Sequence, residues 1–116
     1  MRIDYSKQTG KKISIKGKYN LLINMTDILY MECEGNYTTL YLNLYLGEKR
    51  VCYTETKHLK QFESELSDYG FFRVNNNTLV NGYHIKKVNS KSLFLNDDFE
   101  IKISRRRYNL LKKQLF

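Results

Sequence analysis

Hydrophobic and polar residues alternate along much of the chain, and this pattern predicts many short β-strands. The alternation is clearest over residues 37–46, where four leucines fall on one face and mostly tyrosine, threonine and asparagine on the other. Because a strand points successive side chains to opposite faces, we expect the leucine face to lie in the core. The predicted strands are residues 13–16, 19–25, 28–34, 37–46, 49–54, 71–74, 79–80, 85–88, 92–95 and 99–103.

The period changes between residues 55 and 67, where apolar residues recur at positions i, i+3 and i+7. This spacing predicts one short amphipathic helix. We expect Thr54 or Thr56 to cap its start, and Gly70 lies just past its end. Ser104 is expected to cap a second helix of one or two turns at the C-terminus. The predicted fold is therefore mainly β, with about ten short strands, one mid-chain helix and a short C-terminal helix.

The length of 116 residues fits one domain, and 41% hydrophobic and 28% charged residues are typical of a globular chain. We expect residues 1–11 to be a polar leader or linker remnant and residues 12–116 to form the domain. No apolar run reaches the roughly 20 residues of a membrane helix. The basic N-terminus also lacks the apolar stretch of a secretion signal. We therefore expect a cytoplasmic location and no membrane partner.

Residues suited to catalysis or metal binding are sparse and scattered. The two histidines, His58 and His84, are far apart in the sequence, and no known catalytic or nucleotide-binding motif is present. The neighbouring acids are interpreted as solvated turns and strand ends. The two cysteines have no metal-binding spacing and are expected to be reduced thiols. We expect no enzymatic activity, no cofactor and no metal site.

Positive charge is concentrated at the two ends of the chain. The net charge is +8, and residues 1–20 and residues 100–116 each hold six basic side chains and one acid. The middle of the chain contains more acids than bases. This asymmetry favours an anionic partner, with nucleic acid first among them.

Three polar segments carry side chains suited to nucleic acid. They are residues 34–38, the three asparagines of residues 75–77, and the Ser-Arg-Arg-Arg run of residues 104–107. Asparagine can pair with adenine and arginine with guanine, whereas other cations hold phosphates without reading sequence. The predicted base contacts are Asn36, Tyr37, Thr38, Asn75, Asn76, Asn77, Arg105 and Arg106. The predicted phosphate contacts are Lys11, Lys12, Lys16, Lys18, Arg107, Lys112 and Lys113.

Two alternatives remain open on these residues alone. Tyr37, Tyr41 and Tyr45 would form a row on one strand face, on which single-stranded bases could stack. The same tyrosines would equally pack across strands or against a second sheet. The other alternative is a protein-interaction module that binds no nucleic acid.

Four ordered motifs resemble the LytTR family of bacterial DNA-binding domains. Residues 27–37 (DILYMECEGNY) resemble the family's "IxYIE…xGNY" opening, and residues 71–81 (FFRVNNNTLVN) resemble "FxRxHRSxxVN". Residues 56–66 resemble the family's short helix. Residues 103–106 (ISRR) resemble its "VSRR" ending, which "LLKK" follows. The resemblance covers about residues 12–115.

The resemblance implies an elongated stack of small antiparallel sheets. It also implies the output domain of a LytR/AlgR-type response regulator in a two-component system, which binds duplex DNA through loops in the major groove. Dimerisation on repeated half-sites and an upstream receiver domain are further expectations from the family. Its contact positions carry over to the same three polar segments. One departure is that Asn75–Asn77 replaces the family's His-Arg-Ser. We expect weaker phosphate attraction there, with adenine readout retained and Arg107 compensating.

Overall fold

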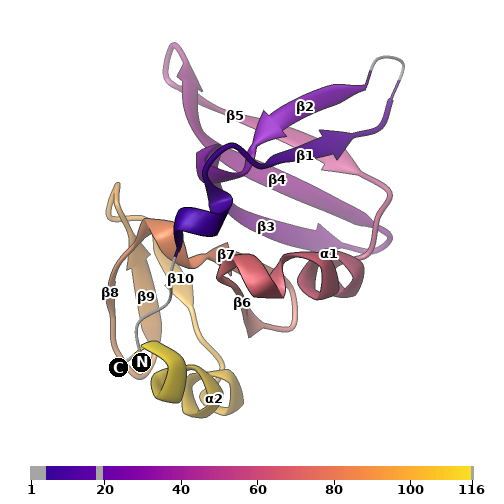
Figure 1. The fold of residues 1–116 in the computed structure, drawn as a ribbon. Coiled ribbons are helices and arrows are strands. Elements are labelled where there is room, and N and C mark those ends of the chain that lie inside the picture. Colours follow the sequence, from indigo (N-terminus) through magenta and orange to yellow (C-terminus); the bar gives the residue numbers. More distant parts are fainter. Residues whose placement is uncertain (1–4, 18–19, 116) are drawn as a thin grey trace.

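The computed structural model describes residues 5–17 and 20–115, which form ten strands, two α-helices and several short 3₁₀ turns (Figure 1). These residues confirm the mainly β prediction. The strands and helices are β1 (Lys12–Ile15), β2 (Leu21–Asn24), β3 (Ile28–Glu34), β4 (Tyr37–Leu46), β5 (Lys49–Glu55), α1 (Leu59–Leu66), β6 (Phe71–Asn75), β7 (Thr78–Asn81), β8 (Ile85–Val88), β9 (Ser92–Leu95), β10 (Glu100–Lys102) and α2 (Arg105–Leu115).

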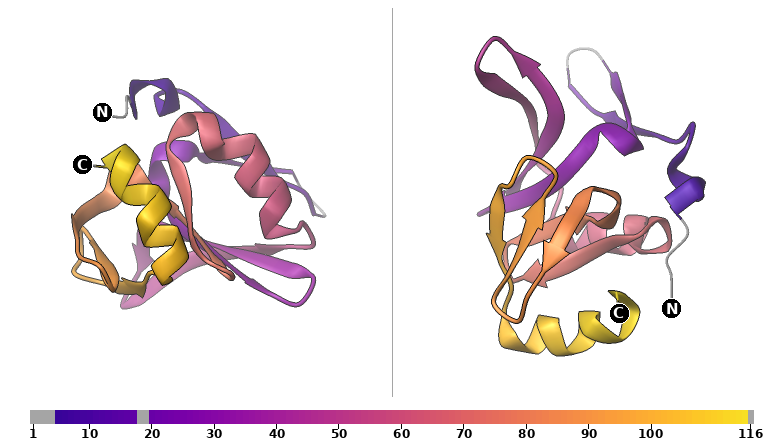
Figure 2. Two further views of the ribbon diagram at one scale, coloured as in Figure 1. Left: turned by 90° about the horizontal axis from the view of Figure 1, so that it is seen from below. Right: turned by 90° about the vertical axis from the view of Figure 1, so that its left-hand side faces the viewer.

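The strands form three antiparallel sheets. The central sheet has the order β5-β4-β3-β7-β6, β1 pairs with β2, and the third sheet has the order β10-β9-β8. Figures 1 and 2 show the β1–β2 hairpin and the β8–β10 sheet as separate bodies beside the central sheet. Since β3 lies in the middle, it pairs with both β4 and β7. The two hairpins that carry the first two polar segments, β3–β4 and β6–β7, are thereby neighbours in one sheet.

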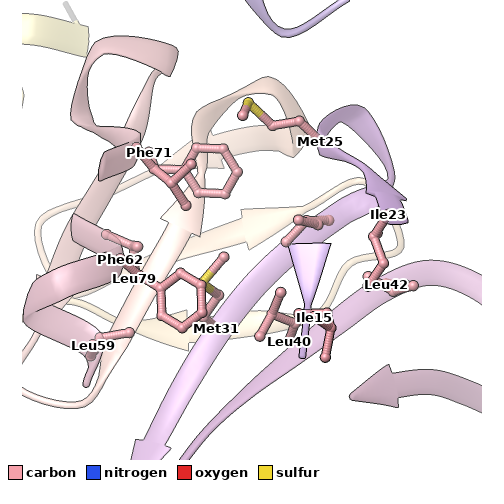
Figure 3. Close-up of a cluster of buried hydrophobic side chains, with 12 residues drawn as sticks. Ile15, Ile23, Met25, Met31, Leu40, Leu42, Leu59, Phe62, Phe71 and Leu79 are labelled. Atoms are coloured by element: carbon pink, nitrogen blue, oxygen red, sulfur yellow. The ribbon is translucent and has the colours of Figure 1, made fainter. Parts of the chain in front are cut away.

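One hydrophobic core lies between the central sheet, α1 and the β1–β2 hairpin (Figure 3). Its members come from distant parts of the sequence, and several are almost completely buried. Burying such aliphatic and aromatic side chains contributes roughly 1.5–3 kcal/mol each. The buried residues are Ile15, Ile23, Met25, Ile28, Met31, Leu40, Leu42, Leu59, Phe62, Leu66, Phe71 and Leu79.

A second core lies on the opposite face of the central sheet, against β8–β10 and α2. Consecutive residues of one strand serve the two cores in turn: Phe71 belongs to the first and Phe72 to the second. The same holds for Leu79 and Val80 on β7. Strands buried on both faces read as continuous apolar runs, which explains the run at the start of β3. This second core fixes the start of α2, and with it the third polar segment.

Two local predictions are wrong. Leu44 and Leu46 do not lie in the core but are 46% and 77% exposed. The pairing between β4 and β5 shifts register between Tyr41 and Tyr45, and the end of the β4–β5 hairpin extends beyond the cores. A strict alternation of side chains therefore does not guarantee burial where no second layer covers the strand.

The predicted caps of α1 also differ from the structure. Strand β5 continues to Glu55, so Thr54 lies in the strand and not at the helix. The N-cap residue is His58, whose side chain makes no capping hydrogen bond. Gly70 does terminate the following 3₁₀ turn in the left-handed conformation, with φ of 86°. Helix α2 is longer than predicted, with eleven residues.

The N-terminal residues do not form a separate leader where the structure describes them. Tyr5–Gln8 is a 3₁₀ turn, and Gln8 is fully buried. Its Nε2 lies 2.6 Å from the carbonyl oxygen of Tyr69 and 2.8 Å from Oδ1 of Asn81. The buried amide is satisfied by these partners, as buried polar groups generally are. The sequence alone does not reveal this, because a glutamine is as common on the surface.

Candidate nucleic-acid interface

The β6–β7 turn presents two of its three asparagines to solvent. The side chain of Asn75 is occupied within the protein: Oδ1 accepts from the backbone nitrogen of Asn77 at 2.9 Å, and Nδ2 donates to the carbonyl oxygen of Lys102 at 2.8 Å. An asparagine that bonds to the backbone two residues ahead forms an Asx turn. Asn76 and Asn77 are exposed. The side chain of Asn75 therefore shapes the turn, whereas Asn76 is exposed and Asn77, also exposed, accepts from the Cys33 Sγ at 3.8 Å.

Arg73 holds this turn from the side of the helix α1. Its Nε lies 3.1 Å from the carbonyl oxygen of Asn75, and its Nη2 lies 2.5 Å from that of Asn76. The third guanidinium nitrogen, Nη1, lies 2.9 Å from Oε1 of Glu63. A planar guanidinium with several fixed donors suits this role better than the flexible ammonium of lysine.

The start of α2 is anchored to β6. The backbone nitrogen of Ser104 donates to the carbonyl oxygen of Val74 at 2.9 Å, and the Ser104 Oγ accepts from the backbone nitrogen of Arg107 at 3.3 Å. Ser104 thus caps the helix as predicted. Arg105 and Arg106 are exposed in the first turn, and neither side chain has a partner among the described residues. Two unpaired cations at a helix N-terminus oppose the helix dipole and favour an anion in front of them.

Arg107 differs from its two neighbours. Its side chain is only 23% exposed, and its Nη1 lies 3.7 Å from Oε2 of Glu63. Its Nε is buried and has no hydrogen-bond partner within the described part of the chain. The predicted phosphate contact of Arg107 is not supported, because the guanidinium faces α1 and is used within the protein.

The first polar segment is divided in the same way. Asn36 and Tyr37 are exposed at the β3–β4 turn. Thr38 is fully buried, and its Oγ1 donates to the carbonyl oxygen of Lys57 at 2.6 Å. The prediction of Thr38 as a base contact is wrong, since its hydroxyl lies inside the protein and joins β4 to the loop before α1.

A groove of about 730 Å³ brings the ends of all three segments together. The backbone nitrogen of Cys33 donates to the carbonyl oxygen of Asn77 at 2.9 Å, so the end of β3 lies directly beside the β6–β7 turn. The groove is lined by Tyr30, Glu32, Cys33, Glu34, Asn75, Asn76, Asn77, Thr78, Phe99, Glu100, Ile101, Lys102, Ile103 and Ser104.

Residues 18–116 match the family model of the LytTr DNA-binding domain. This chain belongs to the LytTR family. A solved structure, the LytTr DNA-binding domain of a Bacillus cereus protein described as a methyl-accepting/DNA response regulator, has the same fold with a TM-score of 0.70. The two chains are 21% identical, and the similarity covers 90% of this chain and 96% of that one. No match is found among curated proteins.

Family membership makes DNA the partner of this LytTR domain and confirms the predicted resemblance. It assigns transcription regulation to the chain and agrees with the expected absence of enzymatic function. None of the described helices is long and apolar enough to cross a membrane.

The predicted phosphate contacts of the LytTR domain lie in two places. Lys11, Lys12 and Lys16 are exposed on the β1–β2 hairpin and do not line the groove, and Lys12 Nζ lies 2.9 Å from Oδ1 of Asn24. Lys18 lies outside the described residues. Lys112 and Lys113 are exposed in the last turn of α2, where a cation interacts favourably with the helix dipole.

Lys91 is a basic residue beside the site that was not among the predicted contacts. Its carbonyl oxygen accepts from the backbone nitrogen of Ile103 at 2.9 Å, which places the β8–β9 turn next to the start of α2. The Lys91 side chain is exposed and, among the described residues, has no ion-pair partner. Only the tertiary pairing distinguishes it from Lys86, which lies 2.9 Å from Asp98.

The tyrosine row does not form a free stacking surface. Tyr41 stacks on Tyr30 with ring centroids 4.6 Å apart, and Tyr30 stacks on Phe99 at 5.3 Å. Burial, and then the neighbouring Tyr41 and Glu32, raise the pKa of Tyr30 to about 12. Tyr45 is exposed but hydrogen bonds to Asp97 and accepts from Arg50. The central member of the row therefore belongs to the packing between the sheets.

Proposed function

We propose that this LytTR domain binds duplex DNA sequence-specifically, as the DNA-binding part of a bacterial transcription regulator acting in the cytoplasm. The observation that carries the proposal is the groove at which the end of β3, the β6–β7 turn and Ser104, just before α2, meet. At or next to the groove, Asn36, Asn76 and Arg106 are exposed, and their side chains have no partner among the described residues. Loops and a helix start of this size can enter the major groove, where the base edges carry a distinct donor and acceptor code.

The proposed base contacts are narrower than the sequence indicated. They are Asn76 and Asn77 from the β6–β7 turn, Arg105 and Arg106 from α2, and Asn36 with Tyr37 from the β3–β4 turn. Arg106 and Arg105 suit guanine, and Asn76 suits adenine. Thr38, Asn75 and Arg107 support these residues from within the protein.

The proposed phosphate contacts begin with Lys91, because it lies next to the α2 start and has no ion-pair partner among the described residues. Lys112 and Lys113 follow on the same helix as the arginines. The lysines of the β1–β2 hairpin, Lys11, Lys12 and Lys16, are retained as contacts to DNA that extends beyond the groove. Such contacts set affinity and orientation but carry no sequence information.

The decisive experiment is selection of binding sites from random duplex DNA, followed by titration of the enriched duplex and of its separate strands. The proposal expects one enriched motif and tight binding of the duplex, with affinity that falls steeply as salt is raised. Enrichment of no motif would contradict sequence-specific binding.

Single-stranded binding is the second candidate, and Tyr37 and Tyr45, which are 55% and 51% exposed, are its remaining support. Preference for the separate strands, lost in Tyr37→Ala, would replace the duplex proposal with this one. Dimerisation on repeated half-sites and fusion to a receiver domain remain proposals that rest on family resemblance. Sedimentation of the protein with one and with two selected half-sites tests the first of them.

A further inference from the structure

Among the described residues, the Glu63 side chain pairs both with Arg73, which holds the β6–β7 turn, and with Arg107 in the first turn of α2. Its Oε1 lies 2.9 Å from Nη1 of Arg73, and its Oε2 lies 3.7 Å from Nη1 of Arg107. The carboxylate is 31% exposed, and the two arginine side chains are 16% and 23% exposed. Partial burial makes such charge pairs less screened than pairs on the open surface.

The two arginines connect Glu63 to the β6–β7 turn and to the first turn of α2, which carry the proposed base contacts. Arg73 donates to the carbonyl oxygens of Asn75 and Asn76 and so fixes the backbone that carries Asn76. Arg107 follows directly after the exposed Arg105 and Arg106 in the first turn of α2. One carboxylate on α1 therefore spans the β6–β7 turn and the helix start.

We propose that Glu63 is a positioning residue for DNA recognition, which fixes the spacing between Asn76 and the Arg105–Arg106 pair. The inference rests on the proposed function, because it concerns the geometry of those contacts. Base contacts must be held within about 0.5 Å to be read together. Phosphate contacts tolerate displacement, since a charge attracts a phosphate over a longer range. Glu63 therefore acts on selectivity more than on general attraction to DNA.

Removing the negative charge of Glu63 is expected to affect non-specific binding in the opposite direction from binding to the selected site. Two guanidinium groups share one carboxylate here. Replacing Glu63 with a neutral side chain removes a negative charge beside the site and releases Arg107. Non-specific affinity is therefore expected to stay the same or to rise, while affinity for the selected site falls. A residue with a merely structural role would change both affinities in the same direction.

The test compares Glu63→Gln with Glu65→Gln, which removes the same charge from the same helix. Glu65 pairs with Lys57 and lines a different groove, away from the β6–β7 turn. Glu63→Gln is expected to lower the ratio of specific to non-specific affinity roughly 3- to 30-fold. Glu65→Gln should leave this ratio unchanged. Equal ratios in Glu63→Gln and the wild-type protein would overturn the inference.

Two further measurements keep the test decisive. If circular dichroism shows that Glu63→Gln is unfolded, Arg107→Met is used in its place, because it removes the pairing between Glu63 and α2. It is expected to lower the same ratio of specific to non-specific affinity. Amide chemical shifts of the DNA-free protein are expected to change at both Asn76 and Arg106 in Glu63→Gln, but not in Glu65→Gln. No change at either amide contradicts the bridge whatever the protein binds. If the wild-type protein bound selected and unselected duplexes equally well, the proposed function would be refuted instead.

Discussion

The side-chain amide of Asn75 donates a 2.8 Å hydrogen bond to the backbone carbonyl oxygen of Lys102. This bond joins the β6–β7 turn to β10, two residues before Ser104. Together with the bond from the backbone nitrogen of Ser104 to the carbonyl oxygen of Val74, it ties the β6–β7 hairpin to the segment that leads into α2. Asn76, the next residue in the turn, is exposed, so two adjacent asparagines differ in their surroundings.

This division predicts different effects for two adjacent asparagines. Asn75→Ala removes two hydrogen bonds of a partly buried side chain and should lower the free energy of unfolding by about 1–2 kcal/mol. Asn76→Ala should leave stability unchanged but weaken binding to the selected duplex by about 1–3 kcal/mol. Urea denaturation and DNA titration of both variants check this. The reverse assignment of the two effects would show that Asn75 reads the base.

Arg106 is expected to discriminate one base pair. Arg106→Ala should weaken binding to the selected site by about 1–3 kcal/mol and relax its preference at one position. Arg106→Lys is the matched control, because it keeps the charge but loses the two-pronged donor geometry. It should retain the salt dependence of the wild-type protein and still lose the base preference. Unchanged preference in both variants would remove Arg106 from the base contacts.

Lys91 is expected to contact a phosphate. Lys91→Ala should weaken binding to all duplexes alike and reduce the slope of log affinity against log salt by about 1. Lys86→Ala is the control: it removes the same charge from β8, the strand before the turn that holds Lys91, and Lys86 is paired with Asp98. Titrations at several salt concentrations should show the smaller slope only in Lys91→Ala. A slope equal to that of the wild-type protein would contradict the contact.

The stability of the protein should decline at alkaline pH through Tyr30. Burial, followed by the neighbouring Tyr41, raises the pKa of Tyr30 to about 12 from its ordinary value of 10. The contribution of the neutral phenol is complete below pH 10 and is lost as pH rises through about 12. Tyr30→Phe cannot ionise at this position. The difference in unfolding free energy between Tyr30→Phe and the wild-type protein should therefore grow in favour of Tyr30→Phe over this range.

Much of the strand arrangement could be predicted because the local signals agree with one another. Strands β3 and β4 are bounded by Gly35, which adopts a left-handed conformation with φ of 60° in the turn, and both strands were predicted with their observed bounds. Errors occurred where a residue's surroundings decide its role. Leu46 continues the alternation of β4 but extends beyond the cores, and Gln8 is polar but buried.

The candidate site was predicted as three segments, and the structure divides each segment into exposed and internal residues. Asn75 and Arg107 are the same residue types as their exposed neighbours Asn76 and Arg106, and Thr38 is polar like the exposed Asn36 and Tyr37 before it. The partners of Thr38, Asn75 and Arg107 are residues distant in the sequence, Lys57, Lys102 and Glu63. Lys91 is the opposite case, a residue that was not predicted as a contact. Nothing in the sequence distinguishes it from other lysines, and only its backbone hydrogen bond with Ile103 places it beside the site.

The sequence by itself determined the strand pattern, the two-ended positive charge and the motifs that resemble the LytTR family, because these depend on residue order and type. The tertiary structure decided which polar side chains are free to meet DNA. That choice depends on hydrogen bonds and ion pairs between residues far apart in the chain, such as Glu63 with Arg107. A side chain already paired inside the protein would lose that pairing on turning outward, whereas Asn76 and Arg106 lose none.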